Sequence, residues 1–282
     1  MLSIIICNRN SKIDPVLAKN IHNTVGFEHE IVSIDNSRGH YNIFQAYNEG
    51  IRRAKGNILC FTHDDVLFKG NGWGATVERI FSEDDMLGAL GVDGGHFMPD
   101  CPCTWTSCHT TSFRTWRDDK DGFCREYSNK EFANGEHLVE VASIDGLWMC
   151  IRRSLFDTIY FDDKTFTGFH CYDSDICMQI LAAGYHIKVT YDIDIIHNSN
   201  GTYNPQFFNN IELWHKKWHY LLPIVRGIEL TPKEQMIHQR YAIELLERQK
   251  EAASLYSRLH SQEYRLGHLL LKPYRFLKRK LK

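Results

Sequence analysis

Residues 57–66 of this chain read NILCFTHDDV. The run from Asn57 to Phe61 predicts a short buried strand, and the polar residues His63, Asp64 and Asp65 stand where that strand ends. Open α/β sheets bind ligands outside the carboxyl ends of their strands, and carboxylate oxygens there suit a divalent cation that carries phosphates. The stretch therefore predicts a metal and diphosphate site. The alternative is turn or helix-capping chemistry, which also places aspartate after a strand.

The residues before and after this stretch predict alternating strands and helices. Strands are expected at residues 2–7, 30–34, 57–61 and 87–92, and helices at about 16–25, 43–54 and 73–81. This spacing implies parallel pairing, with the carboxyl ends of the strands opening on one side of the sheet. We therefore predict an α/β fold with a mixed, mostly parallel central sheet flanked by helices. Asp35 and Asp65 are expected to face one crevice.

The second half of the chain has a weaker pattern. Residues 93–137 show no sustained period, which predicts long loops and a hairpin around an opening. Regular signals return at residues 139–150, then in a helical pattern over 173–183 and a strand over 187–189. A capped helix is expected to begin at Thr231 and to continue to about Glu263.

Composition limits the class of protein. The chain has 282 residues, is 43% hydrophobic and 24% charged, and has a net charge of −2, so nothing favours a nucleic-acid partner. The sequence shows no apolar stretch long enough to span a membrane and no signal peptide at its start, which predicts a cytoplasmic location. Nine cysteines, several of them inside apolar runs, are expected to be reduced thiols. A zinc site at Cys101, Cys103, Cys108 and His109 is a weaker alternative, because the spacing is not that of a zinc ribbon.

The order of these motifs resembles the bacterial, nucleotide-sugar-dependent family 2 glycosyltransferases of the GT-A fold. Those enzymes move a sugar from a nucleotide diphosphate donor to an acceptor hydroxyl, and the resemblance covers about residues 2–200. It implies a GT-A domain over residues 1–225, with a nucleotide-binding half at 1–92 and an acceptor half at 93–225. Residues 226–282 would then be a helical carboxyl-terminal extension with a basic tail.

The resemblance also implies a donor site for a UDP-, GDP- or dTDP-sugar. The opening strand and its loop would contact the nucleotide, and the aspartate after the second strand would contact the base or ribose. A third contribution would come from the helix before the metal motif. The donor residues implied in this way are Cys7, Asn8, Arg9, Asp35, Asn36, Asn48, His63 and Asp64.

The metal motif of the family, Asp-X-Asp, appears here as His63-Asp64-Asp65. The resemblance implies that Asp65 holds Mn²⁺ or Mg²⁺, while His63 either binds the metal through a ring nitrogen or contacts the nucleotide. His197 follows an apolar strand and looks like the late histidine that completes the metal site in several relatives. The alternative for His197 is a hydrogen-bonded structural histidine.

Residues 170–175, HCYDSD, resemble the family's Glu-Asp region. Asp173 matches the general base that takes the proton of the acceptor hydroxyl, although Tyr172 stands where glutamate is usual. A helix cap is the alternative role for this aspartate. Asp145 and Trp148 fall where relatives line the acceptor pocket, and Trp148 could stack on a sugar or pack in the core. A single base without a covalent nucleophile implies inversion at the anomeric carbon.

The end of the chain is basic. From Arg265 to Lys282 it contains seven Lys or Arg and no acidic residue, with leucines and aromatics between them. This composition suits a segment lying on an anionic membrane, and the alternatives are a disordered tail or a packed helix. A cytoplasmic enzyme in contact with the inner face of the cell membrane would suit a glycan or lipid-linked oligosaccharide acceptor.

Two other functions remain open at the level of sequence. An inactive sugar-nucleotide-binding or scaffold protein would be consistent with the replacement of acids by His63 and Tyr172. A nucleotidyltransferase can share the fold and the metal, but it usually carries a glycine-rich basic loop after its first strand. Residues 8–11, NRNS, are not such a loop.

Overall fold

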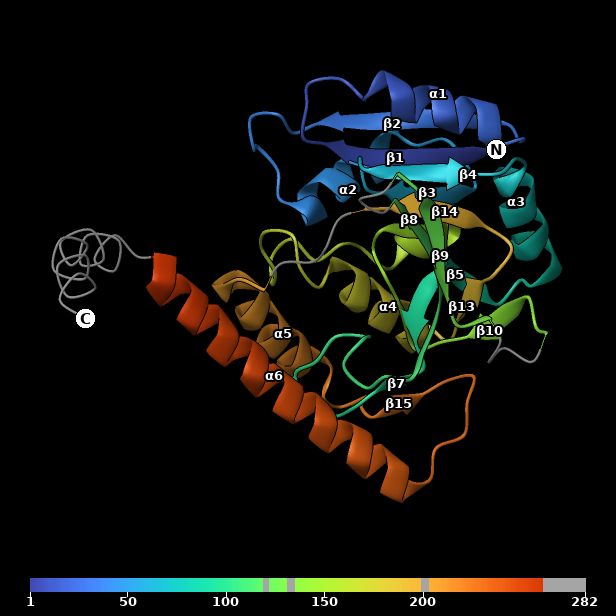
Figure 1. Ribbon diagram of the computed structural model, residues 1–282. Coiled ribbons are helices and arrows are strands. Elements are labelled where there is room, and N and C mark those ends of the chain that lie inside the picture. Colours follow the sequence, from blue (N-terminus) through green and yellow to red (C-terminus); the bar gives the residue numbers. More distant parts are fainter. Residues whose placement is uncertain (119–121, 131–134, 199–202, 261–282) are drawn as a thin grey trace, which may run out of the picture.

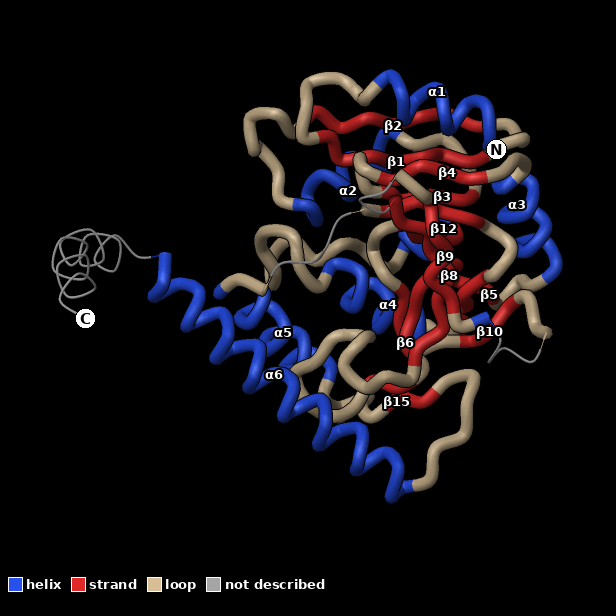
Figure 2. The backbone as a smooth tube through the Cα atoms, in the orientation of Figure 1, coloured by secondary structure: helices blue, strands red, loops and turns tan. Residues whose placement is uncertain are grey.

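The computed structural model describes residues 1–118, 122–130, 135–198 and 203–260. A mixed seven-stranded sheet forms its centre, in the order β10-β13-β5-β12-β3-β1-β2 (Figures 1 and 2). The strands of this sheet are β1 (Leu2–Asn8), β2 (His29–Asp35), β3 (Ile58–Thr62), β5 (Leu87–Gly91), β10 (Leu138–Glu140), β12 (Trp148–Arg152) and β13 (His186–Thr190). The predicted α/β class with a mixed, mostly parallel sheet is confirmed.

Strand direction decides which residues meet at the sheet edge. β1 pairs in parallel with both β2 and β3, and Asn8 lies opposite Asp35 at the carboxyl end of the first pair. β12 runs the other way between β3 and β5, contrary to uniformly parallel pairing. The chain therefore enters β12 at the edge where β3 ends, and the backbone N–H of His63 donates a hydrogen bond to the Leu147 carbonyl at 3.0 Å.

Helices cover both faces of the central sheet. α1 (Pro15–Thr24) and α3 (Trp73–Glu83) pack with Ile4 and Ile6 on one face, while α2 (Ile43–Arg53) packs with Ile5 on the other. This alternation follows from strand geometry, because successive side chains point to opposite faces. Gly50 of α2 lies directly against the Ile5 side chain, where a Cβ atom would overlap it. The glycine thus allows close contact between helix and sheet.

A second sheet covers much of the region predicted as loops. Its order is β11-β6-β8-β14-β4, with β9 paired to β8. The strands are β4 (Val66–Lys69), β6 (Asp93–Gly95), β8 (Thr111–Asp118), β9 (Cys124–Ser128), β11 (Ser143–Ile144) and β14 (Asp194–His197). The expected hairpin is β8–β9, and residues 99–110 form a long loop as expected, but β6 and β8 stand where loops were also predicted. β6 and β8 are rich in Gly, Thr, Arg and Trp, so no apolar alternation marks them in the sequence.

The remaining elements lie on the carboxyl-terminal side. They are a short sheet of β7 (Phe97–Met98) and β15 (Ile224–Val225), the 3₁₀ helix η2 (Arg153–Asp157), and the helices α4 (Tyr172–Ala182), α5 (Pro205–Trp218) and α6 (Pro232–His260). α6 agrees with the predicted appended helix, whereas α5 was not expected. The predicted basic tail falls in residues 261–282, outside the described residues. In the described part of the chain, no helix combines the length and the apolar character needed to cross a membrane.

Candidate active site

A cavity of about 810 Å³ opens where β1, β3, β4 and α4 end or begin. Part of its lining is formed by Cys7 at the end of β1, and by Arg9 and Asn36 in the loops that follow β1 and β2. Another part is formed by Trp105 and by the segment before α4. Acidic and imidazole groups also line the cavity, and they are His63, Asp64, Asp65, Asp93, Asp145, His170, Asp173 and His197.

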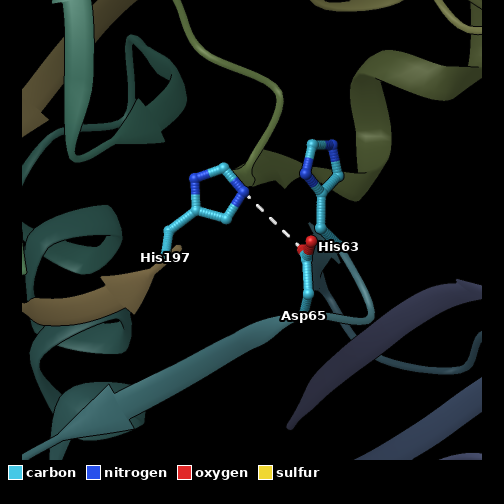
Figure 3. A group of neighbouring side chains, drawn as sticks. All are labelled: His63, Asp65 and His197. Carbon is cyan, nitrogen blue, oxygen red and sulfur yellow. Dashed lines mark ion pairs between the residues drawn. The ribbon is translucent and has the colours of Figure 1, made fainter. Parts of the chain in front are cut away.

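His63, Asp65 and His197 form a three-residue group whose ligand atoms all lie within 4.8 Å of one another (Figure 3). Strand pairing brings them together, because β14 runs antiparallel to β4 with His197 opposite Val66. His197 therefore lies beside Asp65, and its Nε2 is 3.6 Å from Asp65 Oδ1. Among the described residues this is the one group of three with the geometry to hold a metal ion.

The donor set of this group fits a divalent transition metal. Within the described part of the chain, Asp65 Oδ1 is buried and has no hydrogen-bond partner, which is costly unless another group or an ion satisfies it. Burial lowers the pKa of His63 despite the nearby carboxylates, so its ring is neutral near pH 7 and one nitrogen can bind a metal. Two imidazoles with one carboxylate suit Mn²⁺ better than Ca²⁺. The predicted metal residues Asp65 and His197 thus lie together, and His63 lies with them.

Tyr172 fixes the orientation of His63. Its hydroxyl lies 2.6 Å from His63 Nε2, and Tyr172 stands at the start of α4. Burial raises the pKa of Tyr172 well above its ordinary value, so the phenol stays protonated. The Tyr172 hydroxyl is therefore positioned to hold the His63 ring in place, as outer partners of metal-binding histidines do.

Asp64 is held by Arg9 rather than facing the metal group. The Arg9 backbone N–H and Nε each lie 3.0 Å from Asp64 Oδ2, and Arg9 Nη2 lies 2.7 Å from Oδ1. Burial alone would raise the pKa of Asp64, but the hydrogen bonds from Arg9 hold it below its ordinary value. The same guanidinium is 3.6 Å from Asp65 Oδ2. Arg9 is thereby fixed over the cavity, with most of its side chain exposed.

Asp173, Asp145 and Asp93 form a group of carboxylates in the lining of the cavity. Asp173 Oδ2 accepts a hydrogen bond from the Gly146 N–H at 3.2 Å, and its Oδ1 accepts one from the Ser174 N–H at 2.7 Å. Burial raises the pKa of Asp173 to about 7, and the nearby Asp145 adds to the effect. Burial and Asp145 likewise raise the pKa of Asp93 to about 8. A carboxyl group with a pKa near 7 can act as a general base at neutral pH.

Asp93 was not predicted as a site residue. Asp93 lines the cavity. Like His63, Asp64 and Asp65, it is a polar residue that comes just after an apolar strand, here β5, and this position could have marked it as a site residue. The glycines around Asp93 are also typical of a loop, so the sequence did not single this residue out. Trp105 was missed as an individual residue as well. It lines the cavity, and its indole Nε1 donates a hydrogen bond to Asp145 Oδ2 at 3.2 Å.

Two predicted site residues are placed elsewhere by the structure. Trp148 is fully buried and packs edge-on against Trp73, so of the two roles that the sequence left open the structure supports packing in the core over stacking on a sugar. Asn48 bonds both the carbonyl and the N–H of Phe161, at 2.7 and 3.1 Å, and it does not line the cavity. The ring of Trp148 is enclosed in the core and the amide of Asn48 is bonded to the backbone of Phe161, so both side chains have structural roles.

Asn8 and Asp35 lie at the edge of the donor side. Asn8 is buried and its side-chain amide bonds Ser33 Oγ. Asp35 is exposed, accepts hydrogen bonds from the Ser37 N–H and Oγ, and does not line the cavity, although the adjacent Asn36 does. All nine cysteines are free thiols, and no group of three metal ligands forms at Cys101, Cys103 and Cys108 in the described residues. The zinc alternative therefore finds no support.

Comparisons with known proteins agree with this geometry. Residues 3–210 match the family described as "Glycosyltransferase like family". Among solved structures, S. aureus TarS 1–349 has a TM-score of 0.50 and 14% identity, covering 86% of this chain and 70% of its own. GalNAc-T7, solved with UDP, GalNAc and Mn²⁺, has a TM-score of 0.50 and 12% identity, covering 78% of this chain and 50% of its own.

The extent of these similarities decides what they establish. At such low identity the two structures show a shared fold, and this chain spans half the length of the GalNAc-T7 chain. A comparison with curated protein sequences finds no match. The family match, by contrast, extends over most of the chain. The protein therefore belongs to the glycosyltransferase-like family and is a glycosyltransferase with the GT-A fold.

Proposed function

We propose that this glycosyltransferase moves a sugar from a UDP-, GDP- or dTDP-linked donor to a hydroxyl of a glycan or lipid-linked oligosaccharide, with Mn²⁺ or Mg²⁺ as cofactor. The observation that carries the proposal is that the His63, Asp65 and His197 group and Asp173 open into the same cavity. GalNAc-T7, which shares the fold, was solved with UDP, GalNAc and Mn²⁺, a ligand set of this kind.

The donor would bind on the side built by residues 1–92. Cys7 and Asn36 line this side, and Asp35, next to Asn36 at the end of β2, would contact a ribose or base at the rim. Arg9 lies over Asp64 and Asp65, where its guanidinium can pair with phosphate oxygens in a planar, bidentate manner. The cluster of carboxylates would otherwise repel a diphosphate, so a positive charge is needed here.

Asp65, His197 and His63 would hold the metal. A divalent cation held by these three residues would neutralise the negative charge that develops on the departing nucleoside diphosphate. Asp65 supplies the negatively charged oxygen, and the buried, neutral ring of His63 supplies nitrogen without adding positive charge. Tyr172 keeps that ring in one orientation through the 2.6 Å contact with Nε2.

Asp173 would act as the general base. The N–H groups of Gly146 and Ser174 fix its carboxylate, and the pKa near 7 suits proton removal from an alcohol. The acceptor oxygen gives its proton to Asp173 and forms a bond to the anomeric carbon, while the bond from that carbon to the diphosphate oxygen breaks. Attack from the face opposite the leaving group inverts the anomeric centre. No second carboxylate is needed as a covalent nucleophile.

The acceptor would lie between Trp105 and Asp145. Trp105 lines the cavity and is half-buried, so part of its ring can meet a sugar face, while its N–H is already bonded to Asp145. Asp145 also accepts a hydrogen bond from the Leu147 N–H at 2.7 Å. These bonds hold the carboxylate next to Asp173 and orient it for acceptor hydroxyls. Trp105 thus takes the place that the sequence suggested for Trp148.

Calorimetric titration with UDP, GDP, dTDP and CDP, each with and without Mn²⁺, tests the donor site without knowledge of the acceptor. We expect one nucleotide to bind, and only with the metal. Asp65→Ala should abolish that binding, whereas Asp173→Asn should retain it and lose transfer. Equal affinity with and without Mn²⁺ would refute the metal assignment.

Product analysis separates the two other functions, with a nucleotide sugar and candidate acceptors in one incubation and a nucleoside triphosphate with a sugar phosphate in another. A scaffold or inactive binding protein would retain nucleotide binding but release no nucleoside diphosphate with any acceptor. A nucleotidyltransferase would release pyrophosphate instead, because it attacks the α-phosphate. We expect nucleoside diphosphate as the product, and pyrophosphate release would overturn the proposal.

A further inference from the structure

One face of α6 packs against the body of the protein. Ala242 is buried in the core cluster, and Leu246 packs against that cluster. One turn further along, Lys250 Nζ pairs with Glu212 Oε1 of α5 at 2.6 Å. These contacts fix which side of α6 faces inward, because residues three or four positions apart are neighbours on a helix surface. Figure 1 shows α6 at the outside of the molecule, with its last turns extending past α5.

A second face of α6 is largely apolar and lies beside the packed one. Its residues recur at alternating spacings of four and three positions, which is the spacing of a coiled-coil seam. We call the following residues the α6 stripe: Tyr241, Leu245, Arg248, Ala252, Leu255 and Leu259. Leu255 and Leu259 are exposed by 58 and 49%, and Tyr241 is exposed by 40% although its hydroxyl lies 2.6 Å from His109 Nε2. Large apolar side chains exposed in one row indicate a binding surface.

The order of residues in the α6 stripe suits a second copy of the same helix that runs in the opposite direction. The spacing reads the same from both ends, so an antiparallel copy places the residues of one stripe opposite those of the other. Each pair then occurs twice, because a two-fold interface is self-complementary. The pairs are Tyr241 with Leu259, Leu245 with Leu255, and Arg248 with Ala252. At a rise of about 1.5 Å per residue, these layers extend over about 27 Å of helix.

Arg248 decides the direction of this pairing. In a parallel pair, the two Arg248 side chains would meet in one layer, where like charges disfavour association. In the antiparallel pair, each Arg248 meets the small side chain of Ala252 and lies next to Glu251 of the other copy. Arg248 and Glu251 are both exposed and therefore accessible to a second chain. The α6 stripe is thus complementary to itself in charge as well as in apolar character, and only in the antiparallel orientation.

The charges on the outer side of α6 disfavour a different occupant. Glu244, Glu247 and Glu251 are all exposed on the side that faces away from the body. They would be repelled by an anionic lipid surface, whereas charge of both signs along a helix is typical of helices that pair with each other. A second copy of this chain is therefore the occupant that the α6 stripe fits.

We propose that two copies of this protein associate through the α6 stripe as an antiparallel helix pair with two-fold symmetry. None of the six stripe residues lines the cavity, so this association is independent of donor binding and of sugar transfer. A contact of one helix pair lies at the low end of specific interface sizes. We therefore expect a weak dimer, with a dissociation constant in the micromolar range.

Sedimentation velocity of the full chain, at concentrations from about 1 to about 200 µM, measures this association. The test variant is Leu255→Glu with Leu259→Glu. The matched control is Met236→Glu with Ile243→Glu, on the same helix but outside the α6 stripe, at residues exposed by 69 and 40%. Both variants add two negative charges, so a general effect of charge would appear in both. Thermal unfolding checks that each variant remains folded, which we expect because all four side chains are exposed.

We expect the parent and the control to approach the mass of two chains as concentration rises. The test variant should bind its second copy about tenfold or more weakly, because charges replace apolar side chains in the contact. A parent that stays monomeric over the whole range, or equal behaviour of the two variants, would overturn the proposal. Growth of the parent into larger species would also contradict it, because a two-fold contact closes at two copies.

An exchange of charge tests the antiparallel register. Arg248→Glu or Glu251→Arg alone brings like charges together across the contact, so each should weaken the dimer about tenfold. The two changes combined restore the reciprocal pair, and the affinity should return to within about threefold of that of the parent. A double variant in which the two losses add would show that Arg248 and Glu251 do not meet between copies, and the proposed register would be wrong.

Calorimetric titration of nucleotides into the same variants keeps this result separate from the proposed function. Leu255 and Leu259 do not line the cavity, so donor affinity should match that of the parent. Lost dimerisation with intact donor binding supports the α6 contact. Absent donor binding in every form of the protein would refute the donor site and leave the result on association unaffected.

Discussion

Trp105 Nε1 donates a hydrogen bond to Asp145 Oδ2 at 3.2 Å, although the two residues stand 40 positions apart. Burial is the main cause of the raised pKa of Asp173, and the nearby negative charge of Asp145 raises it further. The loop that carries Trp105 is thereby connected to the proposed base. Gly95 of β6 lies directly against the Trp105 carbonyl, where a Cβ atom would clash, so the glycine allows this loop to approach β6 closely.

Replacing Trp105 by Ala should weaken acceptor use without changing donor affinity, because the ring lies on the acceptor side of the cavity. We expect the KM for the acceptor to rise about tenfold, the size of a lost stacking contact of about 1 kcal/mol or slightly more. Trp105→Phe keeps an aromatic face and loses the N–H, so it should lie between Ala and the parent. Steady-state kinetics and nucleotide calorimetry check this, and a loss of donor affinity in Trp105→Ala would count against the assignment.

Replacing Tyr172 by Phe should weaken metal binding. The hydroxyl that holds His63 Nε2 is lost while the ring remains packed, so the His63 ring becomes free to turn. Loss of an outer partner of a metal-binding histidine typically costs 10- to 100-fold in metal affinity or activity. Titration of Mn²⁺ in the presence of nucleotide measures the change. An unchanged Mn²⁺ affinity would mean that His63 is not a ligand.

The rate of transfer should depend on pH through Asp173. A base is active when deprotonated, and burial with the neighbouring Asp145 raises the pKa of Asp173 to about 7. The kcat/KM should therefore rise as pH increases through about 7 and level off above it. Asp145→Asn removes the nearby negative charge, so the midpoint should move to lower pH. If the midpoint of kcat/KM against pH does not move in Asp145→Asn, the pH dependence arises from a group other than Asp173.

Replacing Lys217 by Met should destabilise the fold. Lys217 Nζ lies 2.8 Å from both Asp162 Oδ2 and Asp175 Oδ1, and both carboxylates are buried. Removing one partner of a buried ion pair typically costs about 3–5 kcal/mol, because a buried charge is left uncompensated. Urea unfolding at pH 7 measures the loss. Lys216→Met, at an exposed position of the same helix, is the control and should change stability by less than about 0.5 kcal/mol.

The same pair of variants tests the pH dependence of stability. Burial would raise the pKa of Asp162, but the bond from Lys217 and those from Thr165 lower it to about 2. A carboxylate with a lowered pKa contributes stability that is present above its ordinary pKa of 3.8 and is lost as pH falls toward 2. The difference between the parent and Lys217→Met should therefore be largest near neutral pH and shrink in acid. A constant difference would contradict this role of Lys217.

Much of the amino-terminal half could be predicted from the sequence because its signals are local. β1, α1, β2, α2 and β3 each have a continuous apolar run or a helical period. The predicted positions of Asp65 and Asp173 also depend on local order, since one follows a strand and the other begins a helix. Parallel pairing then places the ends of β1, β2 and β3 at one edge. These features require no knowledge of distant contacts.

The structure of the acceptor side could not be predicted in this way, because it depends on strand pairings that no local sequence pattern marks. The short polar strands of the second sheet were expected to be loops, and the pairing of β14 with β4 is what sets His197 beside Asp65. Trp148 and Trp105 are the same residue type, yet one is fully buried in the core and the other lines the cavity. Residue type and local period determined the strands, helices and chemical groups, while only tertiary packing decided which groups face one another. The reason is that burial and hydrogen bonding depend on neighbours distant in the chain, which no local pattern encodes.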